Sequence, residues 1–286
     1  MLLSEAFDRY RLDVIVYKNQ SKKTEENHLI VKRALLRHFG DISLEELTFE
    51  QVRDWKLELD KRRSPETVRN YIIKLRVVLG HTLRLGVPVL DPELIAVPKR
   101  TDKVPKFISP EDVDKLLNAN NSNDIPKLCQ KRNKAVISLL YASGIRVSEL
   151  ISLDRANLHD NSFTIIGKGG KARLCFFDAR AEQYINAYLI TRTDNHAALF
   201  INKNNTRMST GNVQEMFQAL SKRAGFDVPV TPHVLRHSFS TNFLQNNGNM
   251  RYLQALLGHS SLETTQMYAH VVDEDLRGIY TKYHSI

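Results

Sequence analysis

The chain has 286 residues and a formal net charge of +9; 42% of its residues are hydrophobic and 26% are charged. This length suits two domains with complete cores, and the composition excludes a chain that is disordered throughout. The excess of Lys and Arg is spread over both halves of the chain and favours a polyanionic partner such as nucleic acid.

Cysteine usage and hydropathy bear on the compartment. Cys129 and Cys175 lie far apart and form no C-x-x-C motif, so neither a disulfide framework nor a zinc site is predicted. Charged residues begin at Glu5, and no apolar run reaches the ~18–20 residues that a membrane span needs. We therefore expect a cytoplasmic protein with neither a signal peptide nor a membrane anchor.

The first part of the chain has the apolar periodicity of helices joined by short polar turns, which predicts a compact four-helix bundle. Thr24, Thr48 and Ser64 are predicted N-caps, and Gly40 and Gly86 stand where helices should end. The predicted helices cover residues 4–18, 24–39, 48–62 and 64–86.

Basic residues gather around the turns of this bundle and on its fourth helix. They form either a solvated surface, as most charged runs do, or a set of phosphate contacts. The residues concerned are Lys22, Lys23, Lys61, Arg62, Arg63, Arg69, Lys74 and Arg76.

Prolines divide the chain. Five of them occur between Val87 and Asp112, so no continuous helix can cross this segment. Residues 1–97 are predicted to form the first domain, 98–108 the linker and 109–286 the second domain. The linker is basic and extended, which suits a segment that passes beside a nucleic-acid duplex.

A helix is expected to restart at Ser109, and a strongly apolar helix follows at 127–142. The next segment, Gly144-Ile-Arg-Val-Ser-Glu-Leu, places Arg146 and Glu149 three residues apart on one face of a short helix. Such a pair is most often a structural ion pair.

Two strands, 162–166 and 172–177, are predicted around Gly167-Lys-Gly-Gly-Lys, with glycines in the turn of a hairpin. This glycine-rich turn is not a P-loop, because it lacks the required spacing and leads into a strand instead of a helix. The turn carries two lysines, Lys168 and Lys171.

After amphipathic helices at 179–193 and 209–224, the segment 231–270 collects polar residues within an apolar framework. Thr231-Pro232 is typical of a helix start, so His233 and Arg236 fall on the first turns of a helix, where anions are favoured. A leucine-rich helix then ends at Gly258 and is followed by His259. Tyr268 lies about two turns into the next predicted helix.

Five motifs carry a resemblance: G-x-R-x-S-E-L, G-K-G-x-K-x-R, H-x-L-R-H, L-G-H and T-T-x-x-Y-x-H. In this order they resemble the signature of the tyrosine site-specific recombinases, the phage integrase and Xer family. The resemblance implies a mainly α fold with a small antiparallel β-sheet. It implies an N-terminal four-helix core-binding domain, SAM-like, followed by a mixed α/β catalytic domain.

The resemblance further implies strand cleavage and rejoining of duplex DNA through a 3′-phosphotyrosine, with no metal and no cofactor. Two arginines suit a phosphate that gains charge during the reaction, since each guanidinium is always charged and can bind two oxygens. Tyr268 would be the nucleophile, His233 its proton acceptor, and Lys171 the acid for the departing 5′-hydroxyl. Lys168 competes with Lys171 for this assignment. The complete predicted catalytic set is Arg146, Lys171, His233, Arg236, His259 and Tyr268, with Glu149 supporting Arg146.

The predicted partner is a double-stranded recombination site bound by a homotetramer, with a second recombinase or an activating protein left open. No additional domain is expected before the helical bundle, which resembles the simple Xer layout and differs from integrases with an extra arm-binding domain. The biological role is either chromosome dimer resolution or movement of a mobile element. Behind Tyr268, an apolar stripe is expected to pack on its own domain by default, or on a neighbouring subunit if the family's subunit exchange applies. Its residues are Leu276, Ile279, Tyr280 and Tyr283.

Three other functions compete with this prediction. His233 and His237 have the i, i+4 spacing of metal ligands, but a zincin would need Glu where Val234 stands. A DNA-binding regulator or accessory recombinase would have no use for a nucleophile. A type IB topoisomerase would share the chemistry, yet the terminal helix after Tyr268 favours a recombinase.

Overall fold

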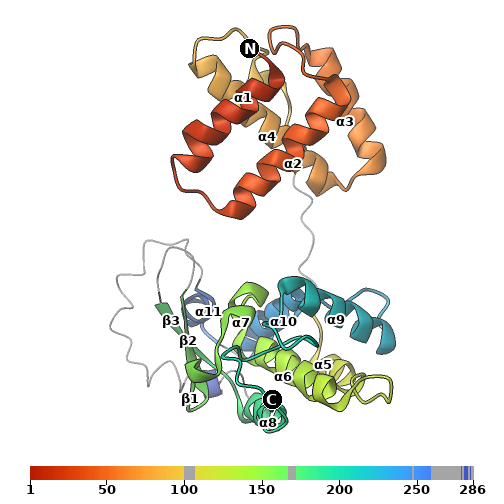
Figure 1. The fold of residues 1–286 in the computed structure, drawn as a ribbon, viewed down its shortest axis with the longest axis vertical. Coiled ribbons are helices and arrows are strands. Elements are labelled where there is room, and N and C mark those ends of the chain that lie inside the picture. The colour runs from red at the N-terminus through yellow and green to blue at the C-terminus, as the bar shows by residue number, and fades with distance from the viewer. Residues whose placement is uncertain are drawn as a thin grey trace. The chain divides into compact units, whose positions relative to one another are not determined.

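The computed structural model describes residues 1–99, 107–166, 172–246, 248–258, 278, 280–282 and 284. The chain forms two compact units, Met1–Lys103 and Val104–Ile286, here called the N-terminal and C-terminal units (Figure 1). The division falls within the segment 98–108 that the sequence predicts as a linker. Both units are mainly helical and the described strands form one small antiparallel sheet, so the predicted fold class is confirmed.

In residues 1–99, which the structure describes, four α-helices surround an apolar core that includes Phe7, Leu35 and Trp55. The first helix continues directly into a π-helical segment, and a short 3-10 turn follows the fourth helix. The elements are α1 (Leu3–Tyr10), η1 (Arg11–Val16), α2 (Lys22–Phe39), α3 (Phe49–Arg62), α4 (Pro65–Arg84) and η2 (Pro92–Leu94).

Side-chain caps set the starts of these helices. The Thr48 and Ser64 hydroxyls accept hydrogen bonds from backbone N–H groups of α3 and α4, as predicted. The predicted cap Thr24 is wrong: Ser21 is the N-cap of α2, and its hydroxyl accepts the Thr24 N–H at 3.2 Å. Thr24 therefore lies inside the first turn, because two hydroxyl residues three positions apart compete for this role and the upstream one wins.

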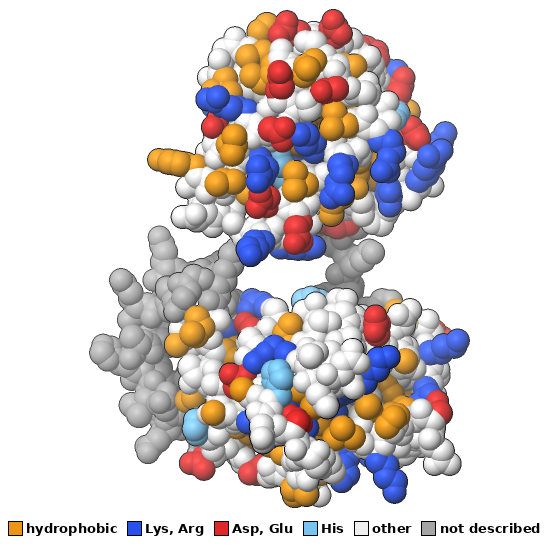
Figure 2. Space-filling model, in the orientation of Figure 1, with side chains coloured by type: hydrophobic (Ala, Val, Ile, Leu, Met, Phe, Trp, Pro, Cys, Tyr) orange, Lys and Arg blue, Asp and Glu red, His pale blue; other side chains and the backbone are white. Residues whose placement is uncertain are grey.

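The basic residues of this unit differ in exposure. Lys22, Lys23 and the cluster 61–63 are exposed, whereas Arg69, Lys74 and Arg76 are half-buried. On the visible face of the N-terminal unit, Lys and Arg side chains gather over its lower half (Figure 2). Burial lowers the pKa of Lys74, whose ammonium lies 5.6 Å from the centre of the Tyr10 ring.

The C-terminal unit is built around α6 (Lys127–Ser143), whose residues from Ala135 to Ser143 are all buried. This helix packs against neighbours on several sides, namely α5 (Pro110–Asn118), α7 (Val147–Ser152), α8 (Ala179–Leu189), α10 (Pro232–Gln245) and the strand β3 (Ala172–Phe176). The described part of the unit also contains α9 (Thr210–Arg223) and α11 (Met250–Leu257). Among the described residues, no helix is both long and apolar enough to cross a membrane.

The sheet has the order β1-β2-β3 and lies at one side of the unit, with α11 beside β3 (Figure 1). Strands β2 (Ser162–Ile166) and β3 pair antiparallel, with Ser162 opposite Phe176 and Ile166 opposite Ala172. This is the predicted hairpin. The sequence missed the two-residue strand β1 (Leu158–His159), which follows the 3-10 turn η3 (Arg155–Asn157), because two residues carry no measurable alternation.

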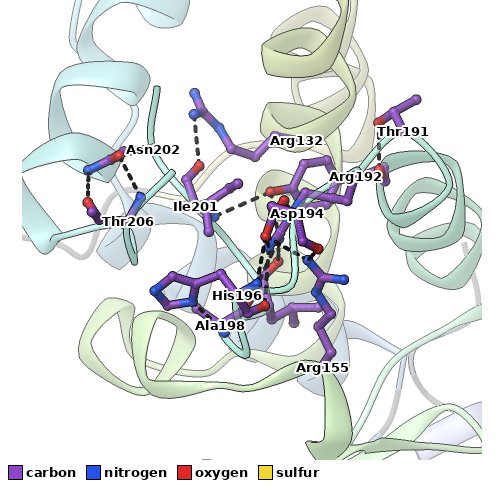
Figure 3. A network of polar contacts seen from close by, with 12 residues as sticks. Arg132, Arg155, Thr191, Arg192, Asp194, His196, Ala198, Ile201, Asn202 and Thr206 are labelled. Carbon is purple, nitrogen blue, oxygen red and sulfur yellow. Dashed lines mark hydrogen bonds and ion pairs between the residues drawn. The ribbon is translucent and has the colours of Figure 1, made fainter. Parts of the chain in front are cut away.

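A network of buried arginine contacts holds the loop between α8 and α9 (Figure 3). The fully buried Arg192 binds both carboxylate oxygens of Asp194 and donates to the carbonyl of Leu199 at 3.0 Å. Arg155 donates to Asp194 as well, at 2.9 Å. These charge-assisted bonds hold the pKa of Asp194 well below its usual range.

Near the chain terminus, the described residues Tyr280 and His284 pack on the C-terminal unit. The Tyr280 hydroxyl donates to the carbonyl of Ala142 at 2.8 Å, and the His284 ring lies 4.7 Å from that of Phe239 and 5.5 Å from that of Tyr141. The default prediction for the tail is therefore observed for Tyr280. Leu276, Ile279 and Tyr283 lie outside the described residues, and docking on a neighbouring subunit stays a prediction.

Protonation of His284 should loosen this tail. His284 is 1% exposed with no hydrogen-bond partner for its ring nitrogens among the described residues, and burial lowers its pKa to about 4. A histidine whose folded pKa lies below its free value of about 6.5 stabilises the docked state less as pH falls below 6.5. Lowering the pH from 7.5 to 5.5 should raise the undocking equilibrium constant about 10-fold.

Hydrogen exchange of the His284 amide, which donates to the Tyr280 carbonyl at 2.9 Å, measures this equilibrium after correction for the intrinsic exchange rate. The variant His284→Phe should remove the pH dependence. Equal protection of the wild-type amide at both pH values would contradict the assignment.

Candidate active site

The first predicted site residue, Arg146, lies where α6 ends and α7 begins. Gly144 terminates α6 with φ +62°, a left-handed conformation that a side chain would strain. Arg146 is then the N-cap of α7, and its backbone N–H donates to Oε2 of Glu149 at 2.7 Å. Its Nη1 donates to Oε1 of the same carboxylate at 3.0 Å. Glu149 thus holds both the main chain and the side chain of Arg146.

Glu149 is shared with a second arginine from the sheet. Arg173 on β3 donates from Nη1 to Oε1 at 3.0 Å and from Nη2 to Oε2 at 2.9 Å, a bidentate pair. Burial alone would raise the pKa of Glu149, which is only 8% exposed. The hydrogen bonds from Arg173 and Arg146 outweigh burial and hold the pKa below its usual value, so the carboxylate stays charged at neutral pH.

The third arginine, Arg236, comes from α10 and is 8% exposed. Its Nη1 donates to the carbonyl of Gly144 at 2.6 Å and its Nη2 to the carbonyl of Leu257 at 2.9 Å. Burial, and then the neighbouring charge of Arg146, lowers its pKa from 12.5 to about 10. This shift corresponds to a cost of about 3 kcal/mol for the charged form.

His233 lies one turn before Arg236 on α10 and is exposed. Thr231 caps this helix by accepting the Val234 N–H, and Pro232 occupies its first position, as predicted. His233 and Arg236 therefore share one face of the first turns. Among the described residues, no group of three or more metal-ligating side chains occurs.

The structure thus gathers Arg146, Glu149 and Arg236 from the predicted set at the junction of α6, α7 and α10. The predicted residues Lys171, His259 and Tyr268 lie outside the described residues, as does the competing Lys168. Their neighbours are described: Arg173 follows Lys171 by two positions, and Gly258 precedes His259 directly.

Sequence reasoning assigned no role to Arg173, although it is the final residue of the G-K-G-x-K-x-R motif. Its guanidinium also donates from Nε to the carbonyl of Leu256 at 3.2 Å. The motif was the only available signal, because nothing in the local sequence indicates that β3 lies against both α7 and α11.

Gly258 ends α11 with φ +61°, and a Cβ at this position would lie 2.8 Å from Cδ of Arg173. Gly258→Ala should therefore destabilise the protein by more than the ~1–2 kcal/mol that a left-handed residue costs. Gly225→Ala is the matched control, since Gly225 has φ +78° and a Cβ there would meet no heavy atom within 4 Å.

Urea unfolding followed by circular dichroism compares the two variants. We expect the free energy of unfolding to fall further in Gly258→Ala than in Gly225→Ala. Equal losses would mean that Arg173 moves aside freely.

The chain resembles known proteins over most of its length. Residues 106–275 match the family model described as the phage integrase family. The tyrosine recombinase XerD of Oceanobacillus iheyensis is 35% identical over 235 residues, covering 79% of this chain and 78% of the relative. The tyrosine recombinase XerC of Alcanivorax borkumensis is 33% identical over 268 residues, covering 91% and 86%.

Among solved structures, the Tn1549 transposon integrase in complex with circular intermediate DNA superposes with a TM-score of 0.75. It is 19% identical in sequence and the match covers 97% of this chain and 98% of that one, so it supports the fold. The predicted family and enzyme class are confirmed: the chain belongs to the phage integrase family and is a tyrosine recombinase.

Proposed function

We propose that the protein is an Xer-like site-specific recombinase in which Tyr268 attacks a phosphodiester of duplex DNA. The Tyr268 oxygen bonds to phosphorus and the bond to the 5′-oxygen breaks, which leaves a 3′-phosphotyrosine and a free 5′-hydroxyl. His233 accepts the tyrosine proton, and Lys171 gives a proton to the departing oxygen. A 5′-hydroxyl from a second strand then reverses these steps and joins new ends, so no external energy source is required.

The observation that supports this proposal is a cluster of positive charge. Arg146, Arg173 and Arg236 gather around one carboxylate, Glu149, in the described part of the site. Burial, and then repulsion by the neighbouring Arg146, lowers the pKa of Arg236, so the folded protein keeps this cation in surroundings that disfavour its charge. A bound phosphodiester would relieve this repulsion, and the charge that builds on its oxygens during attack would relieve it further.

The proposed roles follow from the chemistry of each side chain. Arg146 and Arg236 would bind the non-bridging oxygens of the scissile phosphate, and His259 would donate one more hydrogen bond. Arg236 remains charged at neutral pH despite its lowered pKa of about 10. It therefore acts as a fixed cation in the reaction, with no part in proton transfer.

DNA as the partner is supported by the net charge of +9 and by the exposed cations of the N-terminal unit, such as Lys61 and Arg62. The full reaction needs four strands, so we propose a homotetramer on DNA in a cytoplasmic setting. In that assembly the tail leaves its position on its own unit and docks on a neighbour. Similarity to both XerD and XerC relatives fits chromosome dimer resolution, and similarity to a transposon integrase fits a mobile element.

Tyr268→Phe tests the nucleophile, because it removes one oxygen and little packing. Sheared genomic DNA of the source organism is incubated with wild-type or variant protein, and complexes that survive denaturation are recovered and sequenced. Wild-type protein should trap one sequence class, which also identifies the recombination site. Tyr268→Phe should bind a duplex of that sequence yet form no adduct on its nicked version.

Tyr17→Phe is the control, since Tyr17 is 82% exposed in the N-terminal unit and should not affect adduct formation. An undiminished adduct with Tyr268→Phe would refute Tyr268 as the nucleophile. The absence of any adduct with wild-type protein would refute the proposed cleavage.

A further inference from the structure

Arg173 uses all three guanidinium nitrogens on protein groups. Nη1 and Nη2 bind the two oxygens of Glu149 on α7, and Nε binds the carbonyl of Leu256 on α11. The side chain is 11% exposed. Its donors thus bind groups on both α7 and α11. The side chain of Arg146 is more accessible to solvent, at 38% exposed.

The surroundings leave Arg173 little room to move. Gly258 approaches so closely that even a methyl group would lie 2.9 Å from Nη1. The buried Cys175 follows two positions later on β3, and burial raises the pKa of its thiol to about 12, so it stays neutral beside the guanidinium. Burial alone would lower the pKa of Arg173, but its hydrogen bonds to the charged Glu149 outweigh burial and raise it. The cation is therefore permanent.

Arg146 depends on this arrangement. Its backbone N–H and its Nη1 both donate to Glu149, and Glu149 is fixed in turn by the two parallel bonds from Arg173. Without that fork, the nearly buried carboxylate would keep Arg146 as its main partner and would be drawn toward it. The guanidinium of Arg146 would then shift or be neutralised locally, which weakens its hold on an anion.

We propose that Arg173 is a positioning residue for strand cleavage: through Glu149 it fixes the guanidinium of Arg146 against the scissile phosphate. This inference rests on the proposed function. Lys cannot substitute for Arg173, because its ammonium lacks the planar fork that places two parallel donors on the oxygens of Glu149 while a third reaches the carbonyl of Leu256. A displacement of about 1 Å in a group that orients the reaction can cost on the order of 10²-fold in rate.

The test compares single-turnover cleavage by wild-type protein and Arg173→Lys on a nicked duplex carrying the trapped sequence. Three versions of the scissile group are used: the natural phosphate, a methylphosphonate without the non-bridging charge, and a phosphate with sulfur as the bridging 5′ atom. If Arg173 acts through Arg146, the cleavage rate of the variant should fall roughly 10²-fold on the natural phosphate. It should fall much less on the methylphosphonate. Arg146→Lys should show the same pattern.

The sulfur substrate separates the two sides of the reaction. Sulfur is a better leaving group, so it should restore the cleavage rate of Lys171→Ala. It should leave the loss of cleavage rate in Arg173→Lys unchanged. A loss in Arg173→Lys that only sulfur relieves would place Arg173 with Lys171 and overturn the assignment to Arg146. A loss of equal size on all three substrates would mean that Arg173 only supports the fold, which also overturns it.

Arg192→Lys is the matched control, since Arg192 forms a comparable buried bidentate pair with Asp194 in the loop between α8 and α9 (Figure 3). It should lower the denaturation midpoint and leave the cleavage rate of folded protein unchanged. Wild-type cleavage by Arg173→Lys on the natural phosphate refutes the positioning role alone. The absence of an adduct with wild-type protein instead refutes the proposed function.

Discussion

One buried carboxylate, that of Glu149, holds two of the three arginines of the candidate site in place. Each oxygen of Glu149 accepts one bond from Arg173, and Arg146 adds one bond to each through its side chain and its backbone N–H. A buried carboxylate with four charge-assisted or backbone bonds has nearly all its lone pairs satisfied, so it tolerates burial and keeps its charge. The same contact joins strand β3 to the start of α7.

Arg236 is stabilised in a different way, by the ends of two helices. Its bonds go to the carbonyls of Gly144 and Leu257, where α6 and α11 end in left-handed glycines. The C-terminus of a helix carries partial negative charge, which favours a cation there. These partial charges favour the cation of Arg236 beside the two helix ends. The two glycines thus fix both the helix ends and the position of Arg236.

Much of this could be predicted from the sequence, because local signals set local structure. The Thr231-Pro232 start of α10, the glycine ends of α6 and α11, and the hairpin all follow from such signals. The motif spacing then indicated Arg146, Glu149 and Arg236. What the sequence could not reveal depends on contacts across the fold: Arg173 reaches residues 24 and 83 positions away. The placement of Tyr280 against Ala142 is equally non-local, since it spans 138 positions.

If the charge of Glu149 organises the cations for phosphate chemistry, the variant Glu149→Gln should cleave DNA more slowly. The amide keeps the shape of the side chain but removes its charge and presents an N–H₂ group to one of the arginines. The decisive measurement is the single-turnover cleavage rate beside the dissociation constant for the same DNA. We expect a loss of cleavage rate on the order of 10²-fold with little change in affinity. Cleavage at the wild-type rate, or equal losses in rate and affinity, would contradict it.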